Sequence, residues 1–206
     1  MSRNFPIRGR AARFAQASLD MVATMRMRNR MSGFSMVELL VVIGIAAILM
    51  SIAVPSYQSV TTSNRISSEV NSLLGDMQFA RYEAIKEGQT ITVCPSTDGA
   101  TCSLTNVWNT GWIVQTTDLS SGTKYTLRYQ RAFSPSGDSF TSNDGVQSMA
   151  FNREGFASGL TVSTVTFALH DATNTGAYTR CLAVGISGML TTQLNGQTTG
   201  SGQVCS

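Results

Sequence analysis

The chain has 206 residues, 42% of them hydrophobic and 13% charged, which fits one globular domain and excludes a disordered chain. The net charge of +3 is uneven, because residues 1–33 hold seven arginines and one aspartate, a net +6, and residues 34–206 therefore carry −3. The excess of positive charge lies in the N-terminal segment. It therefore gives no reason to expect that residues 34–206 bind nucleic acid. A single histidine, His170, excludes a multi-histidine metal site, and neither a metal nor a cofactor is expected.

An uncharged apolar run extends from Leu39 to Val54 and ends at Pro55. As a helix, its sixteen residues rise about 24 Å, and residues 34–37 extend the apolar length toward the roughly 30 Å of a bilayer core. Arginines precede the run and few charges follow it closely, which orients the N-terminus to the cytoplasm. We therefore predict one membrane span with the remaining chain translocated across the membrane.

A carboxylate, Glu38, stands at the start of this apolar segment. Such a group costs about 3 kcal/mol inside a bilayer and normally marks a functional partner. A secretory signal peptide would instead require a small-residue cleavage motif after the run, and Ala53-Val54-Pro55-Ser56 is a poor one. A segment that serves only to anchor the chain in the membrane would not need the Glu38 carboxylate.

The string Gly33-Phe34-Ser35-Met36-Val37-Glu38-Leu39-Leu40 resembles the signal of type IV prepilins and type II secretion pseudopilins. The resemblance implies cleavage between Gly33 and Phe34, N-methylation of Phe34, and a glutamate, Glu38, as the fifth mature residue. Pro55 matches the proline that ends the membrane-embedded half helix in that class. The implied segments are a cleaved leader at 1–33, a membrane and assembly helix at 34–55, and a periplasmic or extracellular pilin domain at 56–206.

The resemblance also implies location and partners. The mature subunit is expected in the inner membrane with its domain in the periplasm, and then in a pilus or pseudopilus. Its expected partners are other pilins or pseudopilins and the prepilin peptidase/methyltransferase, and Glu38 is expected to neutralise the Phe34 amine of a neighbouring subunit. The leader is long for this class, and later starts lie at Met21, Met25, Met27 and Met31.

An amphipathic pattern follows Pro55. Its apolar positions are Ile66, Val70, Leu73, Met77, Ala80 and Ala84, spaced by three or four residues. This spacing predicts one helical stripe that faces the globular body, in a helix from about Phe34 to Glu87 with Gly88 as C-terminal cap. We expect a kink at Pro55, because proline lacks the amide that would bond to the Ser51 carbonyl.

Short strands separated by turn signals follow the helix. They are expected at Thr90–Cys94, Gly111–Thr116, Lys124–Ala132, Gln147–Phe151, Thr161–Leu169, Arg180–Ile186 and Met189–Leu194. Alternation is clearest at Tyr125, Leu127 and Tyr129. The expected fold is α+β and type IV pilin-like, a long N-terminal helix packed on an antiparallel β domain. The Cys94 to Cys102 segment, with the later Gly111-Trp112-Ile113-Val114, resembles the GspH/FimT branch of minor pilins and pseudopilins.

The four cysteines are Cys94, Cys102, Cys181 and Cys205, and their even number without a C-x-x-C pair favours disulfides in an oxidising compartment. Three connectivities are possible. We favour Cys94–Cys102 and Cys181–Cys205, because each closes a local loop, and the second would tie down the polar C-terminal tail.

Catalysis is not expected. His170 stands beside Asp171 in an apparent Thr/Asn/Gly-rich loop, and no G-x-S-x-G motif is present, so no catalytic residue is assigned.

DNA binding is the main alternative activity. Some similar FimT-like pilins bind DNA through a G-R-x-R pattern, but here Gly188 is followed by Met189, Leu190 and Thr191. Gly188 is instead predicted to lie in a tight hairpin turn with positive φ. The sequence leaves open a basic surface patch as an alternative DNA-binding site. This patch would consist of Lys124, Arg128, Arg131, Arg153 and Arg180. DNA is nevertheless not expected as a partner, because the mature chain is acidic.

The sequence therefore predicts a minor pilin or pseudopilin at the tip or in the priming complex of a filament. The alternatives are a DNA-binding minor pilin for natural transformation and a type II secretion minor pseudopilin.

Overall fold

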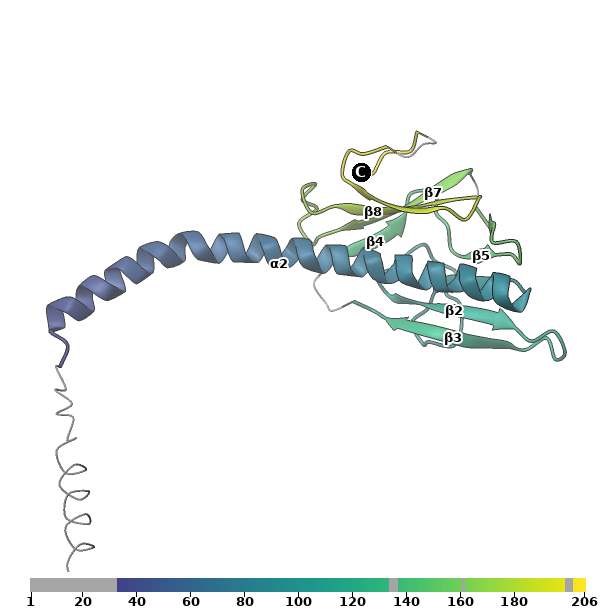
Figure 1. Ribbon diagram of the computed structural model, residues 1–206, viewed down its shortest axis with the longest axis horizontal. Helices are drawn as coiled ribbons and strands as arrows, with labels where there is room; N and C mark the ends of the chain where they lie inside the picture. The colour runs from purple at the N-terminus through teal and green to yellow at the C-terminus, as the bar shows by residue number, and fades with distance from the viewer. Residues whose placement is uncertain (1–32, 134–136, 161, 199–201) are drawn as a thin grey trace, which may run out of the picture. The chain divides into compact units, whose positions relative to one another are not determined.

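The computed structural model describes residues 33–133, 137–160, 162–198 and 202–206. One long helix, α2 (Met36–Glu87), precedes the strands, and its 52 residues agree with the helix expected from the sequence (Figure 1). The chain divides after Ser51 into two compact units, and α2 runs from the first unit into the second. Of the expected leader, Gly33 alone lies within the described residues.

Two antiparallel sheets make up the rest of the second unit. The first sheet has the order β3-β2-β1-β5-β6 and contains β1 (Ile91–Pro95), β2 (Gly111–Thr117), β3 (Lys124–Arg131), β5 (Met149–Phe151) and β6 (Ala157–Ser158). The second has the order β4-β7-β8-β9 and contains β4 (Ser139–Ser142), β7 (Thr164–His170), β8 (Arg180–Gly185) and β9 (Leu190–Leu194).

The predicted helical stripe forms one wall of the core. All six of its apolar side chains are at most 2% exposed, and they join residues of both sheets in a single cluster. The largest sheet and loop side chains in this cluster are Trp108, Trp112, Phe140, Phe151 and Phe167. Figure 1 shows the second part of α2 lying along both sheets. The α+β fold, a long helix packed on antiparallel sheets, is therefore confirmed.

The end of α2 also follows the sequence. Gly88 has a φ of 66°, and the amide of Gln89 donates to the carbonyl of Ala84 at 3.2 Å. A glycine in this left-handed conformation commonly ends a helix, because other residues adopt it at a steric cost.

Three local expectations were wrong. Strands β4 and β6 were not predicted, since Ser139–Ser142 is a short polar stretch between turn signals and β6 has two residues. His170 does not lie in a loop: it ends β7 and pairs with Ser139 of β4.

The alternating residues of β3 do not all lie on one face of the sheet. The register between β2 and β3 shifts between Val114 and Gln115, and Leu127 has no partner there. Such a bulge changes which side chains face the core. Leu127 therefore packs against the core cluster, whereas the ring of Tyr129 lies against Gly99.

Two disulfides join Cys94 to Cys102 and Cys181 to Cys205, with Cα–Cα distances of 5.5 and 5.7 Å. This is the pairing favoured from the sequence. Cys205 and Cys181 form a small cluster with Ala168, separate from the main core. The bond holds the C-terminal segment against the second sheet, where the amide of Cys205 also donates to the carbonyl of Gln197 at 2.9 Å.

Candidate assembly site

The expected processing site lies directly before α2. Gly33, Phe34 and Ser35 precede the helix, and the amide of Leu39 donates to the carbonyl of Ser35 at 3.1 Å. The Phe34 side chain is 74% exposed. Gly33 and Phe34 are both exposed and lie in a short non-helical stretch.

The first part of α2 is apolar and exposed. Its most apolar 18-residue window has a mean hydropathy of 2.7, and none of that window is buried, so by length and composition the helix can cross a membrane. Exposed Leu, Ile and Val side chains in such number are unfavourable in water. The segment needs an apolar environment, and a bilayer or the helices of other subunits would supply one.

Glu38 lies in the first turn of α2, four residues after Phe34. A carboxylate is favoured at this end of a helix by the helix dipole. Among the residues that the structure describes, no cationic side chain lies within 4.0 Å of Glu38. The carboxylate and the expected new N-terminus therefore stand close together in sequence at the same end of the helix.

Pro55 lies inside α2, which is helical from Met36 through Glu87. Proline cannot donate a backbone hydrogen bond, so the Ser51 carbonyl lacks its usual helical partner. Ser51 ends the first unit and Pro55 lies near the start of the second. The expected kink stays a prediction.

A charged cluster on the inner side of α2 was missed by the sequence reasoning. The Arg65 guanidinium contacts Asp138 through both carboxylate oxygens, at 2.9 and 3.0 Å, and Glu69 lies 3.9 Å from Arg65 Nε. Glu69 is 7% exposed, and its Oε2 atom has no hydrogen-bond partner among the residues that the structure describes. Burial, and secondly the charge of Asp138, raise the pKa of Glu69 to about 7, while Arg65 opposes this rise in part.

The basic patch left open by the sequence is largely occupied by internal contacts. Arg128 pairs with Asp76 at 3.0 Å and Arg153 with Glu154 at 2.7 Å. Arg180 donates to the carbonyls of Ala177 and Thr179 at 3.0 and 2.9 Å. The remaining two cations, Lys124 and Arg131, stand at opposite ends of β3. Three of the five residues thus make internal contacts.

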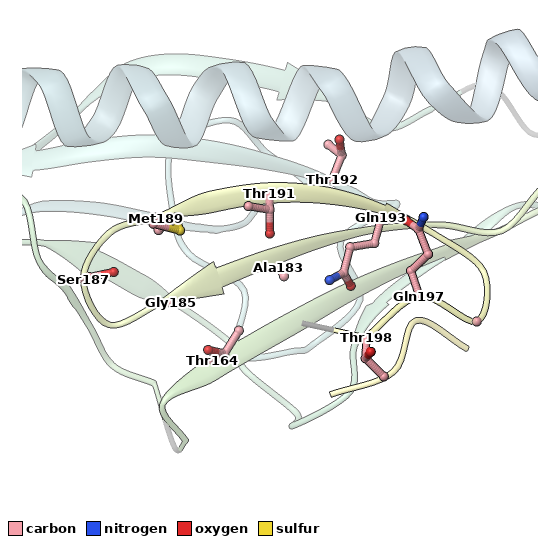
Figure 2. A pocket seen from close by; sticks show the side chains of 11 residues that line it. Thr164, Ala183, Gly185, Ser187, Met189, Thr191, Thr192, Gln193, Gln197 and Thr198 are labelled. Carbon is pink, nitrogen blue, oxygen red and sulfur yellow. The ribbon is translucent and has the colours of Figure 1, made fainter. Parts of the chain in front are cut away.

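The hairpin between β8 and β9 has the predicted turn. Gly188 has a φ of 73°, and its amide donates to the carbonyl of Gly185 at 2.8 Å. A hollow of about 760 Å³ lies beside this hairpin, and its lining is dominated by hydroxyl and amide side chains such as Thr164, Thr191 and Gln193 (Figure 2). Among its described lining residues there is no charged side chain.

Comparisons with known proteins agree with this architecture. The family model for the type II transport protein GspH matches residues 69–188, and that for the prokaryotic N-terminal methylation motif matches residues 28–54. One crystal form of the Pseudomonas aeruginosa type IV minor pilin FimU is 23% identical, with a TM-score of 0.51, over 69% of this chain and 96% of FimU. A second form has 21% identity and a TM-score of 0.48 over 62% and 91%. The Vibrio cholerae minor pseudopilin EpsH has 12% identity and a TM-score of 0.46 over 65% and 99%.

The fold and the methylation motif define a subunit of the type IV pilin class. More narrowly, the chain belongs to the type II transport protein GspH family, whose model covers more than half of its residues. It is a minor pilin or pseudopilin of a type IV pilus or a type II secretion system. Proteins of this class are structural subunits and not enzymes.

Proposed function

We propose that the chain is cleaved between Gly33 and Phe34, N-methylated on Phe34, and assembled through residues 34–55 at the tip or in the priming complex of a filament. The observation that carries the proposal is Glu38, a carboxylate in the first turn of an exposed apolar helix that starts just after the Gly33–Phe34 bond. The match of residues 28–54 to the N-terminal methylation motif supports the same processing.

The physical role of Glu38 follows from its surroundings. Cleavage leaves a cationic amine on Phe34, and both this amine and the Glu38 carboxylate are costly in a bilayer. A pair formed between the amine of one subunit and the carboxylate of the next removes much of that cost, because opposite charges attract strongly at low dielectric. Pairing between subunits also fixes their axial offset. Glu38 thus acts in assembly.

The proposal also includes a cellular location for the subunit. The apolar helix holds the new subunit in the inner membrane, with residues 56–206 in the periplasm, where the two disulfides form. Its partners are the prepilin peptidase/methyltransferase and other pilins or pseudopilins. The description of the matched family favours type II secretion, and the fold likeness to FimU favours a type IV pilus. We therefore retain both a type IV pilus and a type II secretion system as candidates for the machine. Deletion of the gene should impair either surface pili or protein export.

Filament incorporation of Glu38→Ala tests the assembly role. The variant should enter membranes at the wild-type level, whereas its amount in sheared filaments, or in pseudopili formed on overexpression, should fall at least tenfold. Glu87→Ala removes an exposed carboxylate from the other end of α2 and is the matched control, with incorporation unchanged. Normal incorporation of Glu38→Ala would show that this carboxylate is not an assembly contact.

A further inference from the structure

A second surface of the folded unit combines exposed apolar side chains with one cation. Tyr82 and Ile85, on the last turns of α2, are 62% and 53% exposed, and Met189, in the β8–β9 turn, is 65% exposed. Together with Arg81 and Gly188 they line a hollow of about 580 Å³. These five residues are called the Arg81 surface. Large apolar side chains gathered at one place on a folded unit are typical of interaction sites.

Two turns hold Arg81 in place without neutralising it. Its Nε atom donates to the carbonyl of Gly155 at 3.0 Å, and its Nη2 atom donates to that of Ser187 at 3.4 Å. Neither acceptor carries a charge, and within the described part of the chain no carboxylate lies within 4.0 Å of the guanidinium. Nη1 has no hydrogen-bond partner there either, so the group is oriented but retains donors for a further acceptor.

Close packing of backbone around Arg81 depends on glycine. A Cβ atom added to Gly188 would lie 2.1 Å from the Gly155 carbonyl oxygen and 2.9 Å from Arg81 Nε. A Cβ atom on Gly155 would lie 2.9 Å from Ile85 Cδ1. Both glycines have positive φ, at 73° and 81°. The two turns can therefore approach α2 and fix the guanidinium because these positions carry no side chain.

We propose that the Arg81 surface binds a segment of a different subunit of the same machine, one that presents an Asp or Glu carboxylate between apolar side chains. The carboxylate would take the free donors of Arg81, and its apolar neighbours would cover Tyr82, Ile85 and Met189. Interfaces are typically organised in this way, with arginine and aromatic or methionine side chains at their centre. This inference rests on the proposed assembly function and names a contact outside the N-terminal helix.

The composition of the surface favours this occupant over others. A single cation among apolar side chains is a poor match for nucleic acid or anionic lipid, both of which are bound through several cations. One carboxylate is the acceptor that an oriented guanidinium pairs with best. Further exposed apolar side chains stand on the adjoining turns, at Phe156 and Ile186, and the amide of Ala157 joins these turns by donating to the Ile186 carbonyl at 2.9 Å.

Site-specific photocrosslinking in cells, with the full chain, tests the proposal. Tyr82→p-benzoylphenylalanine should give one product with another pilin or pseudopilin in the filament fraction, and mass spectrometry should locate the crosslink beside an Asp or Glu flanked by apolar residues. Leu104→p-benzoylphenylalanine, at an 82% exposed position in the β1–β2 connection, is the control and should not give this product.

Charge reversal then tests the role of Arg81. Arg81→Glu should lower the yield of the Tyr82 product at least tenfold, and replacing the partner's acid with Arg should restore it. Met189→Glu leaves the Arg81 contacts in place and should also lower the yield, whereas Leu104→Glu should not. A yield that is insensitive to both Arg81→Glu and Met189→Glu would overturn the proposal.

The identity of the crosslinked species separates the remaining outcomes. Products with lipid, with nucleic acid, with a second copy of this chain or with a segment that has no acid would each overturn the inference. If the chain enters filaments normally and the Tyr82 position gives no subunit product, the inference fails and the assembly function stands. If the chain is absent from filaments altogether, the assembly function fails and this inference with it.

Discussion

The indole Nε1–H of Trp112 donates to Oδ2 of Asp76 at 2.8 Å, and this bond joins β2 to the helix that covers it. The other oxygen of Asp76 accepts from Arg128 Nη1 on β3 at 3.0 Å. Arg128 in turn lies over the ring of Phe79, with Cζ 3.9 Å from the ring centroid. One carboxylate on α2 therefore satisfies the buried indole of one strand and the guanidinium of the next.

Removing this carboxylate should destabilise the folded unit. In Asp76→Ala the N–H of Trp112, whose side chain is fully buried, loses its partner, so the free energy of unfolding should fall by about 1–3 kcal/mol. Asp76→Asn keeps an acceptor and should lose less. Urea titration of the 56–206 fragment, which we expect to fold alone, measures both, with Glu87→Ala as the exposed control. Equal midpoints for Asp76→Ala and Glu87→Ala would contradict this role.

The features predicted correctly from the sequence are those encoded locally. The helical stripe from Ile66 to Ala84 repeats at helical spacing, and all its apolar members are buried. The N-terminal methylation motif, matched at residues 28–54, is likewise one continuous string. By contrast, the bulge opposite Leu127 and the polar strand β4 depend on neighbouring strands, and no local pattern indicates them.

Contacts between distant segments explain what the sequence could not indicate about the sites. Arg128 looked like a free cation, but it is paired with Asp76, 52 residues earlier. The orientation of Arg81 by Gly155 and Ser187 likewise requires two turns that lie 74 and 106 residues away. Sequence periodicity indicates the face of a helix or strand on which a side chain lies. It does not indicate which residues of distant segments contact that side chain.

The mature protein should begin at Phe34. Cleavage after Gly33 and methylation of the new amine predict an intact mass for residues 34–206 plus one methyl group. Mass spectrometry of the membrane-extracted protein measures it, and Gly33→Val, which places a β-branched side chain at the cleavage site, should leave the leader attached. A mature species that keeps Arg30, or one that begins near Ser56, would contradict the processing.

Glu69 should make the folded unit less stable as the pH rises from about 5 to about 8. Its pKa is raised from 4.5 to about 7 by burial and by Asp138, so in this window the folded state holds a proton that the unfolded state has released. Stability from this group is thus greatest below pH 4.5 and is lost as the pH rises to about 7, with an upper limit of about 3 kcal/mol.

Glu69→Gln isolates the contribution of this carboxyl group to the pH dependence. The amide cannot ionise, so urea titrations of the 56–206 fragment at pH 5 and pH 8 should differ less for the variant than for the wild type. Arg65→Gln should instead increase the pH dependence, because the cation that favours ionised Glu69 is removed. The same pH dependence in wild type and Glu69→Gln would show that Glu69 ionises normally in the folded state.

DNA binding by the folded unit should be weak. Residues 56–206 contain eight Lys and Arg against ten Asp and Glu, a net charge of −2, and Arg128 and Arg153 are each paired with an acid. Release of counterions from phosphates supplies most nonspecific affinity, and each cation already bound to a carboxylate contributes less to it. The dissociation constant for duplex DNA near physiological salt should therefore be about 10⁻⁴ M or weaker.

Arg180 is the most informative residue for this prediction, because it begins β8 and, among the residues that the structure describes, no carboxylate lies within 4.0 Å of its guanidinium. Its guanidinium donates to the carbonyls of Ala177 and Thr179, which orient it without cancelling its charge. One such cation is insufficient for tight binding, so fluorescence anisotropy of labelled duplex at two salt concentrations should show no saturable complex. Micromolar affinity that falls steeply with added salt and is abolished by Arg180→Ala would instead favour a DNA-uptake subunit, since a single unpaired arginine would then be the centre of a phosphate-binding surface.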